Sequence, residues 1–186
     1  MAHDDRVTLP SFPALTSLPA LDNPDLVARP VAAALASWLG AVDVAVVDID
    51  PDLADTAAMS EAYDIPMTAG GNCVVVSGVR AGEERIAACV VRADTRADVN
   101  TLVRKMLDVR KASFLPMERA VAETGMEYGG ITPLGLPEGW RILVHDALLD
   151  EPAVVIGSGV RRSKLLVHGR LLGDLPGAEV VPGLGR

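Results

Sequence analysis

Aromatic side chains are scarce in this chain of 186 residues, of which they make up only 3%. Hydrophobic residues as a whole make up 49%, so a core must be built from Ala, Val, Leu and Ile. Long apolar runs are also missing, since none reaches the roughly 18 residues that a membrane-spanning helix needs. The length suits one domain with a full hydrophobic core, and no membrane association is expected.

Cysteine is rare too. Cys73 and Cys89 each lie inside an apolar run, which predicts buried thiols in a reducing compartment. The chain has no Cys-x-x-Cys pair and no cluster of His and Cys residues, so we expect neither a structural metal nor a cofactor. The segment MAHDDRVTLP carries acids and a proline where a signal peptide carries bases and an apolar stretch, which favours a cytoplasmic location.

Positive charge is in the minority, because 17 Lys and Arg residues face 25 Asp and Glu residues and leave a formal net charge of −8. Such a protein does not attract nucleic acid through its overall field, so DNA binding is not expected and any RNA contact must be local. Basic residues gather at positions 104–111 and again at Arg161, Arg162 and Lys164. Solvated surface is the default interpretation of both clusters.

The first 24 residues contain repeated prolines and little periodicity. This pattern predicts an extended arm over residues 1–24, ahead of a domain over residues 25–186. Apolar anchors along the arm favour its packing partly on the domain: Leu9, Phe12, Leu15 and Leu18.

Short helical and strand patterns follow one another irregularly beyond the arm. Helical patterns cover residues 30–39, 51–63, 95–107 and 117–125, and Thr95-x-x-Asp98 is a possible capping box for the third. Strand patterns cover residues 42–50, 72–80, 85–94, 112–116, 141–148, 153–159 and 163–169. The linker AGEE after the second strand indicates a hairpin. Because the strands lie mostly at hairpin spacing, we predict an α/β fold of the α+β kind, a single compact domain with a mixed or antiparallel sheet.

The segment YGGITPLGLP, residues 128–137, holds three glycines and two prolines around a single hydroxyl, that of Thr132. Glycine lets the backbone approach a ligand closely, and proline fixes φ, so the loop can present its N–H groups in a rigid arrangement. Such donors can bind a carbonyl or a developing oxyanion. An ordinary tight turn is the alternative explanation of the same composition.

Five motifs occur in order along the chain: AGGNCVVV, MLDVRKASF, YGGITPLGL, RILVHDAL and VVIGSGVRRSKLLV. This order resembles the YbaK/EbsC-type aminoacyl-tRNA editing domain, the family that includes the insertion domain of some prolyl-tRNA synthetases. The resemblance covers about residues 42–181, and GGITPLGL is its most specific element. It implies a compact α/β fold with helices around a twisted mixed sheet that approaches a barrel.

The resemblance also implies an activity. The family hydrolyses the ester that joins a wrong amino acid to the 3′ end of a tRNA, either as freestanding proteins or beside a synthetase. Such editing is needed because binding alone separates similar small side chains by only about 1–3 kcal/mol per methylene. We therefore expect a trans-editing deacylase, an aminoacyl-tRNA hydrolase acting on a small amino acid mischarged on a tRNA such as tRNA-Pro, with a synthetase as a further partner.

The expected site residues follow from the resemblance. Gly129, Gly130 and Thr132 are expected to act in catalysis, with Thr132 where the family normally has Ser. The basic pair Arg110 and Lys111 is expected to contact tRNA. Asp146 is expected to bind the α-ammonium of the substrate, although a solvated or capping aspartate explains it equally well. Further substrate-binding positions in the same cleft are Ile131, Pro133, Leu134, Gly135, Gly157, Ser158 and Gly159, the last three of which also suit a plain strand-end turn.

Asn72 is the main departure from the family pattern, because many members have a functional lysine there. The Asn72 amide can still donate and accept a hydrogen bond, and so orient a carbonyl or a water, but it carries no charge. Cys73 is not expected to be a nucleophile, since strand alternation directs it away from the face of Asn72. The same alternation is expected to separate His145 from Asp146.

Two other functions compete with the deacylase. The neutral Asn72 favours a non-catalytic module that binds an aminoacyl group or an amino acid and has lost hydrolysis. The acidic composition is compatible with a third function, the hydrolysis of other small acyl esters, because it does not demand an RNA partner.

Overall fold

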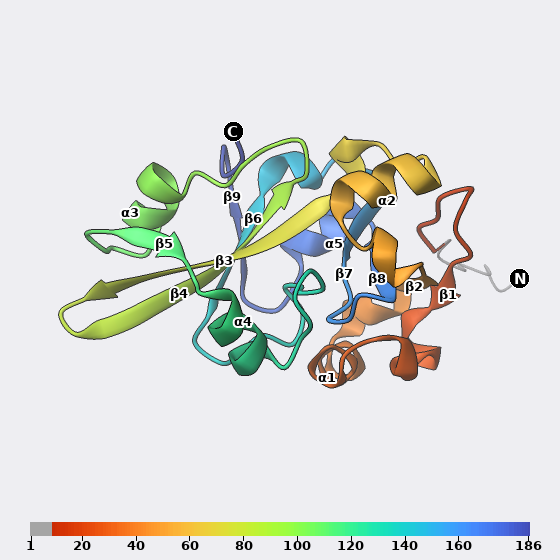
Figure 1. The fold of residues 1–186 in the computed structure, drawn as a ribbon, viewed down its shortest axis with the longest axis horizontal. Coiled ribbons are helices and arrows are strands. Elements are labelled where there is room, and N and C mark those ends of the chain that lie inside the picture. Colours follow the sequence, from red (N-terminus) through yellow and green to blue (C-terminus); the bar gives the residue numbers. More distant parts are fainter. Residues whose placement is uncertain (1–8) are drawn as a thin grey trace, which may run out of the picture.

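Two β-sheets form the framework of the protein (Figure 1), whose computed structural model describes residues 9–186. The first sheet has the strand order β1-β2-β8-β7, and all its neighbouring strands are antiparallel. The second has the order β5-β3-β4-β6-β9, in which β4–β6 and β6–β9 are parallel pairs. The strands are β1 (Leu18–Pro19), β2 (Ala45–Asp48), β3 (Gly71–Arg80), β4 (Glu83–Arg92), β5 (Ala112–Phe114), β6 (Arg141–His145), β7 (Val154–Gly157), β8 (Ser163–Val167) and β9 (Ala178–Val181).

Short helices surround the sheets. The α-helices are α1 (Arg29–Ser37), α2 (Thr56–Tyr63), α3 (Arg104–Met106), α4 (Met117–Thr124) and α5 (Gly169–Gly173). One π-helical segment, η6 (Val99–Val103), leads into α3. Single 3-10 turns are η1 (Ala20–Asp22), η2 (Pro24–Leu26), η3 (Leu39–Asp43), η4 (Pro51–Leu53), η5 (Met67–Ala69) and η7 (Asp146–Leu148). No helix within residues 9–186 is long and apolar enough to cross a membrane.

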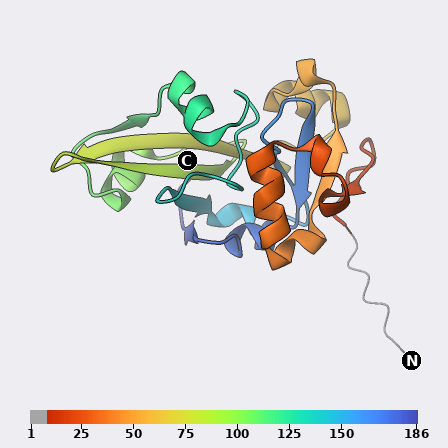
Figure 2. The same cartoon turned by 90° about the horizontal axis from the view of Figure 1, so that it is seen from below.

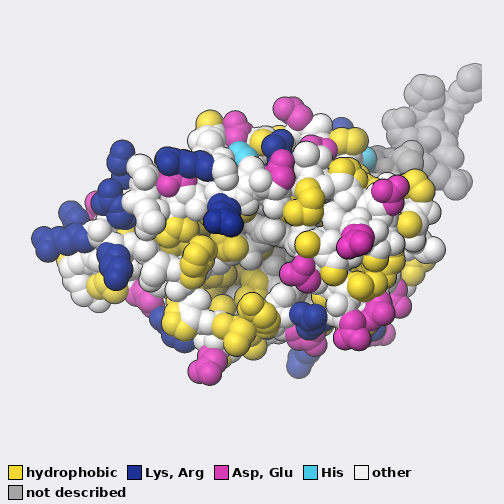
Figure 3. Space-filling view, turned by 45° about the horizontal axis from the view of Figure 1, so that its top comes forward, with side chains coloured by type: hydrophobic (Ala, Val, Ile, Leu, Met, Phe, Trp, Pro, Cys, Tyr) yellow, Lys and Arg dark blue, Asp and Glu magenta, His cyan; other side chains and the backbone are white. Residues whose placement is uncertain are grey.

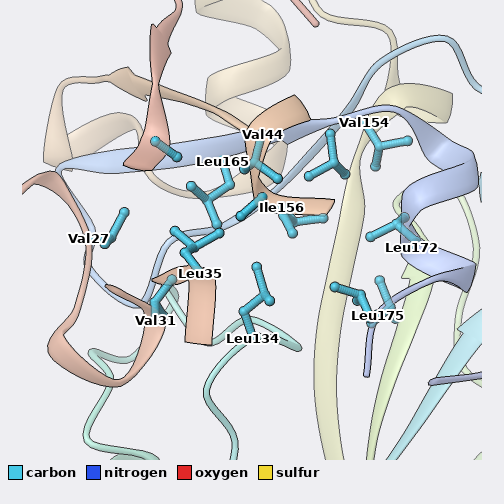
Figure 4. Packing of buried hydrophobic residues seen from close by; sticks show 14 of the residues in the cluster. Val27, Val31, Leu35, Val44, Leu134, Val154, Ile156, Leu165, Leu172 and Leu175 are labelled. Carbon is cyan, nitrogen blue, oxygen red and sulfur yellow. The ribbon is translucent and has the colours of Figure 1, made fainter. Parts of the chain in front are cut away.

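The main core lies between α1 and the first sheet (Figure 4). Val31 and Leu35, one helical turn apart on α1, are buried against Ile156 of β7 and Leu165 of β8. Figure 2 shows α1 lying along this sheet. Leu134, from the loop before β6, packs in the same cluster with 3% of its surface exposed. Because burying one such side chain stabilises by about 1.5–3 kcal/mol, the core also anchors that loop.

The described part of the predicted arm, residues 9–24, lies on the domain. Leu9, Phe12 and Leu15 pack against a second cluster on the first sheet. Leu18 instead remains 39% exposed, but its backbone pairs with Val46 and extends the sheet by the short strand β1. The first eight residues of the predicted arm lie outside the described range.

The predicted mixed α/β fold is confirmed, with one correction to the sheet. The strands divide into two open sheets rather than one sheet that approaches a barrel. The second sheet also contains parallel pairs that hairpin spacing does not predict. They arise because the connection between β4 and β6 is long enough to return the chain in the same direction.

The predicted helix over residues 95–107 begins later than the capping box implies. Thr95 Oγ1 donates to the carbonyl of Arg92 at 2.6 Å. Asp98 is the cap instead, since its carboxylate accepts from the N–H groups of Thr101 at 3.3 Å and Leu102 at 3.0 Å. The guanidinium of Arg186 also binds this carboxylate. The last residue of the chain therefore helps to hold the start of η6, a contact that no local pattern announces.

The turn between β3 and β4 offers a test of the hairpin. Its two residues, Ala81 and Gly82, have φ angles of +53° and +85°, a geometry in which Asn-Gly is preferred. We expect Ala81→Asn to raise the free energy of unfolding by up to about 1 kcal/mol, because alanine is strained in the left-handed region. Gly82→Ala should lower it by about 1 kcal/mol through backbone strain alone, since no atom lies within 4 Å of an added Cβ. Identical denaturation midpoints for the three proteins would contradict this account of the turn.

Candidate functional site

A cavity of about 630 Å³ opens where the two sheets meet. This volume lies within the range of small-molecule sites, about 300–1,000 Å³. The surface drawn in Figure 3 is hollowed near its middle. The cavity wall combines α2, the first half of β3, the β5–α4 segment, the loop around Gly129, the end of β7 and one residue of β8. The site is thus assembled from segments far apart in the sequence.

Glycines at the start of β3 make this junction possible. Gly70 forms an isolated parallel bridge with Val155 of β7, which links the second sheet to the first. A Cβ atom on Gly71 would lie 2.9 Å from Cγ2 of Ile156, a distance that real Cβ contacts do not reach. Two strands from different sheets therefore approach closely here, and Asn72 follows directly at the cavity wall.

Two glycine loops lock together at the opposite wall. Gly159 donates its N–H to the carbonyl of Gly130 at 2.7 Å, and Glu127 donates to the carbonyl of Gly159 at 2.8 Å. A Cβ on Gly157 would lie 2.4 Å from the oxygen of Gly130, and one on Gly130 would lie 2.9 Å from the backbone of Val160. The loop after α4 is therefore held against the segment after β7 by close backbone contact, and the Glu127 carboxylate adds a side-chain contact by accepting from the N–H of Arg161 at 2.6 Å.

The contact between the two glycine loops determines which N–H groups of the loop after α4 can donate to a ligand. The N–H of Gly130 is used within the turn, where it donates to the carbonyl of Glu127 at 2.9 Å. The N–H groups of Gly129 and Ile131 have no hydrogen-bond partner among residues 9–186, and both residues line the cavity. These two amides, rather than that of Gly130, are the candidate donors for a substrate oxygen.

Asn72 is oriented by helix α2. The hydroxyl of Thr56, the first residue of that helix, donates to Oδ1 of Asn72 at 2.7 Å. This bond fixes which way the amide faces and leaves its Nδ2 group without a partner in the described part of the chain. Asn72 therefore presents N–H donors, and no charge, to the cavity.

Lys164 is the cavity residue that the sequence did not reveal. The basic cluster around it was expected on the surface, yet Lys164 is only 6% exposed, because every side chain of β8 is buried. Its Nζ donates to the carbonyl of Ala54 at 2.9 Å. Burial and, to a smaller extent, the positive charge of Arg161 lower its pKa, Asp55 opposes both, and the net result is a pKa of about 8. A lysine inside the apolar run SKLLV was the available signal.

The second half of the glycine loop turns away from the cavity. Thr132 is fully buried, and its Oγ1 has no hydrogen-bond partner in the described structure. Pro133 and Leu134 are buried as well. Gly135 approaches α1 so closely that a Cβ would lie 2.4 Å from the carbonyl oxygen of Pro30. Of the loop residues expected to contact substrate, only Gly129 and Ile131 line the cavity, and Leu134 packs into the core instead.

Three more expected residues lie outside the cavity wall. Ser158 is buried in the turn after β7, where its hydroxyl donates to the carbonyl of Ser163 at 2.9 Å, and Gly159 belongs to the same turn. Asp146 lies at the end of β6, where Oδ1 accepts from the N–H of Gly183 at 3.3 Å. Gly157 alone of the GSG turn lines the cavity.

His145 and Asp146 meet, contrary to expectation. His145 Nε2 lies 3.6 Å from Asp146 Oδ1. Strand alternation does not separate them because β6 ends at His145 and η7 begins at Asp146. Burial lowers the pKa of His145, which favours the neutral imidazole.

Arg110 and Lys111 are exposed near the outer end of the second sheet. Arg110 borders a shallow depression beside the β3–β4 turn, together with Arg80. Figure 3 shows Lys and Arg gathered at this end of the molecule, and Asp and Glu more frequent toward the other. Neither Arg110 nor Lys111 lines the cavity, so any contact they make is with a ligand that extends beyond it.

Cys73 lines the cavity but is not a suitable nucleophile. Burial and the neighbouring Cys89 raise its pKa well above the ordinary range, so the thiol stays protonated at neutral pH. Burial likewise raises the pKa of Cys89 to about 12. Within residues 9–186, no group of three His, Cys, Asp or Glu side chains is placed to hold a metal ion.

Solved structures share this two-sheet arrangement. A "putative trans-editing enzyme for prolyl tRNA synthetase" aligns with a TM-score of 0.70 at 20% identity, over 83% of this chain and 94% of that one. The hypothetical protein APE2540 aligns with a TM-score of 0.67 at 18% identity, over 76% and 90% of the two chains. At these identities the likeness concerns the fold alone.

Sequence comparison gives the family. Residues 50–175 match the model of the aminoacyl-tRNA editing domain. Because this match spans more than half of the chain, the protein belongs to the aminoacyl-tRNA editing domain family. A search of curated proteins finds no match.

The contact between the two glycine loops predicts a pair of contrasting substitutions. Gly157→Ala should lower the free energy of unfolding by about 1–3 kcal/mol, the usual range for overpacking, because its Cβ would collide with the carbonyl of Gly130. Gly173→Ala is the matched control, since its nearest neighbours are side-chain atoms at 3.3 Å and 3.4 Å that can adjust. Urea denaturation of both variants measures the difference, and equal losses would show that the loops do not depend on close backbone contact.

Proposed function

We propose that this protein is a trans-editing deacylase, which hydrolyses the ester between a wrong small amino acid and the 3′ end of a tRNA. The proposal rests on one observation: Asn72, Gly129 and Ile131 line the same cavity, and the N–H groups of Gly129 and Ile131 have no partner within residues 9–186. Family membership supports the reaction class. The similarity to a putative trans-editing enzyme for prolyl tRNA synthetase makes tRNA-Pro the first tRNA to test. The expected place of action is the cytoplasm.

The chemistry requires an ester held in place, a polarised carbonyl and a water. N–H donors fixed by surrounding structure stabilise the negative charge that develops on a carbonyl oxygen, and they do so without reorganising during the reaction. The amides of Gly129 and Ile131 meet this description, because the lock between the glycine loops fixes their backbone. Asn72, held by Thr56, orients the acyl group or the attacking water.

Exposed apolar side chains at the cavity suit the terminal adenosine of a tRNA. Phe114 is 62% exposed, Met117 52% and Tyr128 64%, and all three line the cavity. Unpaired bases at RNA ends are commonly recognised by stacking on such side chains. The basic end around Arg110 and Lys111 is the proposed contact for the acceptor stem, a local attraction that the net charge of −8 does not provide.

A non-catalytic binding module is the second candidate. It is favoured by Asn72, which supplies hydrogen bonds where a charged side chain would neutralise an oxyanion. Such a module would hold an aminoacyl-adenosine or an amino acid, or dock on a synthetase, without breaking the ester. The two candidates differ in turnover, not in binding.

A deacylation assay separates them. Wild-type protein is tested on tRNAs charged with Ala, Cys, Ser and Pro, beside Asn72→Ala, Asn72→Lys and Gly130→Ala. We expect wild type to release at least one small amino acid, Asn72→Ala to be slower, and Gly130→Ala to lose about 100-fold in kcat, because an added Cβ displaces the loop. If only Asn72→Lys hydrolyses, the binding module is the correct function. If wild type and Asn72→Lys are both inert and Gly130→Ala changes nothing, the editing proposal fails.

The exposed aromatic side chains at the cavity, Phe114 and Tyr128, predict a change in substrate binding. Phe114→Ala and Tyr128→Ala should each raise KM roughly 5- to 150-fold, since stacking contributes about 1–3 kcal/mol per base, and leave kcat nearly unchanged. Leu39→Ala is the control, because Leu39 is 93% exposed and does not line the cavity. Steady-state kinetics on the tRNA that the deacylation assay identifies measure both parameters. A fall in kcat at constant KM would place these side chains in the chemical step instead.

A further inference from the structure

We propose that Lys164 is the buried cation of this cavity, which Arg161 also lines, and that it contacts the carbonyl oxygen of the acyl group bound there. The inference rests on the proposed function, since it concerns the same ester. It assigns the charge to β8, on a different sheet from β3, which carries Asn72. A neutral residue at position 72 therefore does not leave the cavity without a cation.

The position of Lys164 follows from strand register. Lys164 pairs with Gly157 of β7 and with Val47 of β2, so it lies in the interior of the first sheet. Because Gly157 has no side chain, nothing on β7 covers the lysine at that point. Lys164 and Gly157 both line the cavity, and the buried stem of the lysine thus ends at its wall.

The ammonium group is incompletely satisfied. It has three N–H donors, and the described structure provides one acceptor, the carbonyl of Ala54 at 2.9 Å. No carboxylate within residues 9–186 forms an ion pair with it. A buried ammonium with free donors is unfavourable unless a ligand oxygen completes its shell. This arrangement is therefore suited to binding an oxygen with partial or full negative charge.

Two charged groups face Lys164 from the elements around it. Asp55, at the start of α2, is engaged as the helix cap, where its Oδ1 accepts from the N–H of Ala57 at 3.0 Å. Arg161, in the turn before β8, donates to the carbonyl of Pro51 at 2.9 Å. Their effects on Lys164 oppose each other, and burial is the largest influence, so its pKa falls to about 8. At pH 7 most molecules still carry the ammonium form.

In the reaction, water adds to the acyl carbon and the carbonyl oxygen becomes an anion. Collapse of this tetrahedral anion breaks the bond to the ribose oxygen, which leaves as a hydroxyl after receiving a proton that originates from the attacking water. Lys164 keeps its own proton throughout and stabilises the anion as it forms. One ester and one water thus give one amino acid and one free 3′ end.

Substitution at Lys164 tests the role in turnover. We expect Lys164→Met to lose about 100-fold in kcat, the usual effect of removing one oxyanion donor. Its thermal stability should not fall, because methionine fills similar space without a buried charge. Lys105→Met removes an exposed lysine and should keep the wild-type kcat. The enzyme-catalysed rate is measured as a function of pH and corrected for spontaneous hydrolysis of the ester. Above pH 8 the rate of the wild type should fall as Lys164 loses its proton, and Lys164→Met should show no such fall. A folded Lys164→Met with wild-type kcat overturns the inference and leaves the proposed function intact.

Direct observation of the lysine gives an answer that does not depend on turnover. The chain has three lysines, Lys105, Lys111 and Lys164, so the 13Cε signals of lysine-labelled wild-type protein are few, and the two exposed lysines serve as references. The probe is 3′-alanylamino-3′-deoxyadenosine, in which an amide replaces the ester. We expect the probe to shift the Lys164 signal alone and to raise its midpoint pH.

The outcomes of this titration are distinct. If wild type is inert on every tRNA but the probe shifts Lys164, the contact is supported while hydrolysis as the function fails. If the probe leaves the Lys164 signal unchanged, the inference is overturned, whatever the enzyme hydrolyses. Should Lys164→Met fail to fold, the titration of the wild-type protein decides.

Discussion

The whole site depends on backbone packing against backbone, where the loop after α4 meets the turn after β7. A Cβ atom on Gly157 would collide with the carbonyl of Gly130 and one on Gly130 with the backbone of Val160, and Gly159 donates its N–H to the carbonyl of Gly130. One side chain adds to this contact, since the Glu127 carboxylate accepts from the N–H of Arg161 at 2.6 Å, but the glycine backbones set how closely the two segments approach. Leu134 then fastens the far end of the loop into the core beneath α1. A short stretch of chain is thereby held from both ends, and the amides between are fixed in direction.

Polar groups reach the cavity from both sheets. Asn72 comes from β3 of one sheet and Lys164 from β8 of the other, and the bridge between Gly70 and Val155 holds the sheets together at that point. Both residues are held by the segment at the start of α2. Thr56 donates to the Asn72 amide, and the carbonyl of Ala54, just ahead of the helix, accepts from Lys164. Neutral donors and charge are therefore separate contributions, made by separate parts of the fold.

Local patterns in the sequence were sufficient for the elements they concern. The β3–β4 hairpin and the helix closed by Gly125 were predictable because their signals lie within a few residues. The parallel pairs of β6 and β9 were not, since they depend on contacts across long connections. The motif predicted the loop but not that Gly129 and Ile131 line the cavity while Thr132 to Leu134 are buried, because this burial depends on packing against distant segments such as α1. Lys164 was misjudged for a similar reason: a run of basic residues looks solvated until the strand register places one of them inside.

The buried lysine gives the stability of the fold and the charge of the cavity opposite dependences on pH. Unfolded chains hold the lysine proton up to about pH 10.4, whereas the folded protein releases it near pH 8. Between these values the unfolded state binds more protons, so the free energy of unfolding increases with pH. The fold consequently gains stability in alkaline solution as its cavity loses charge.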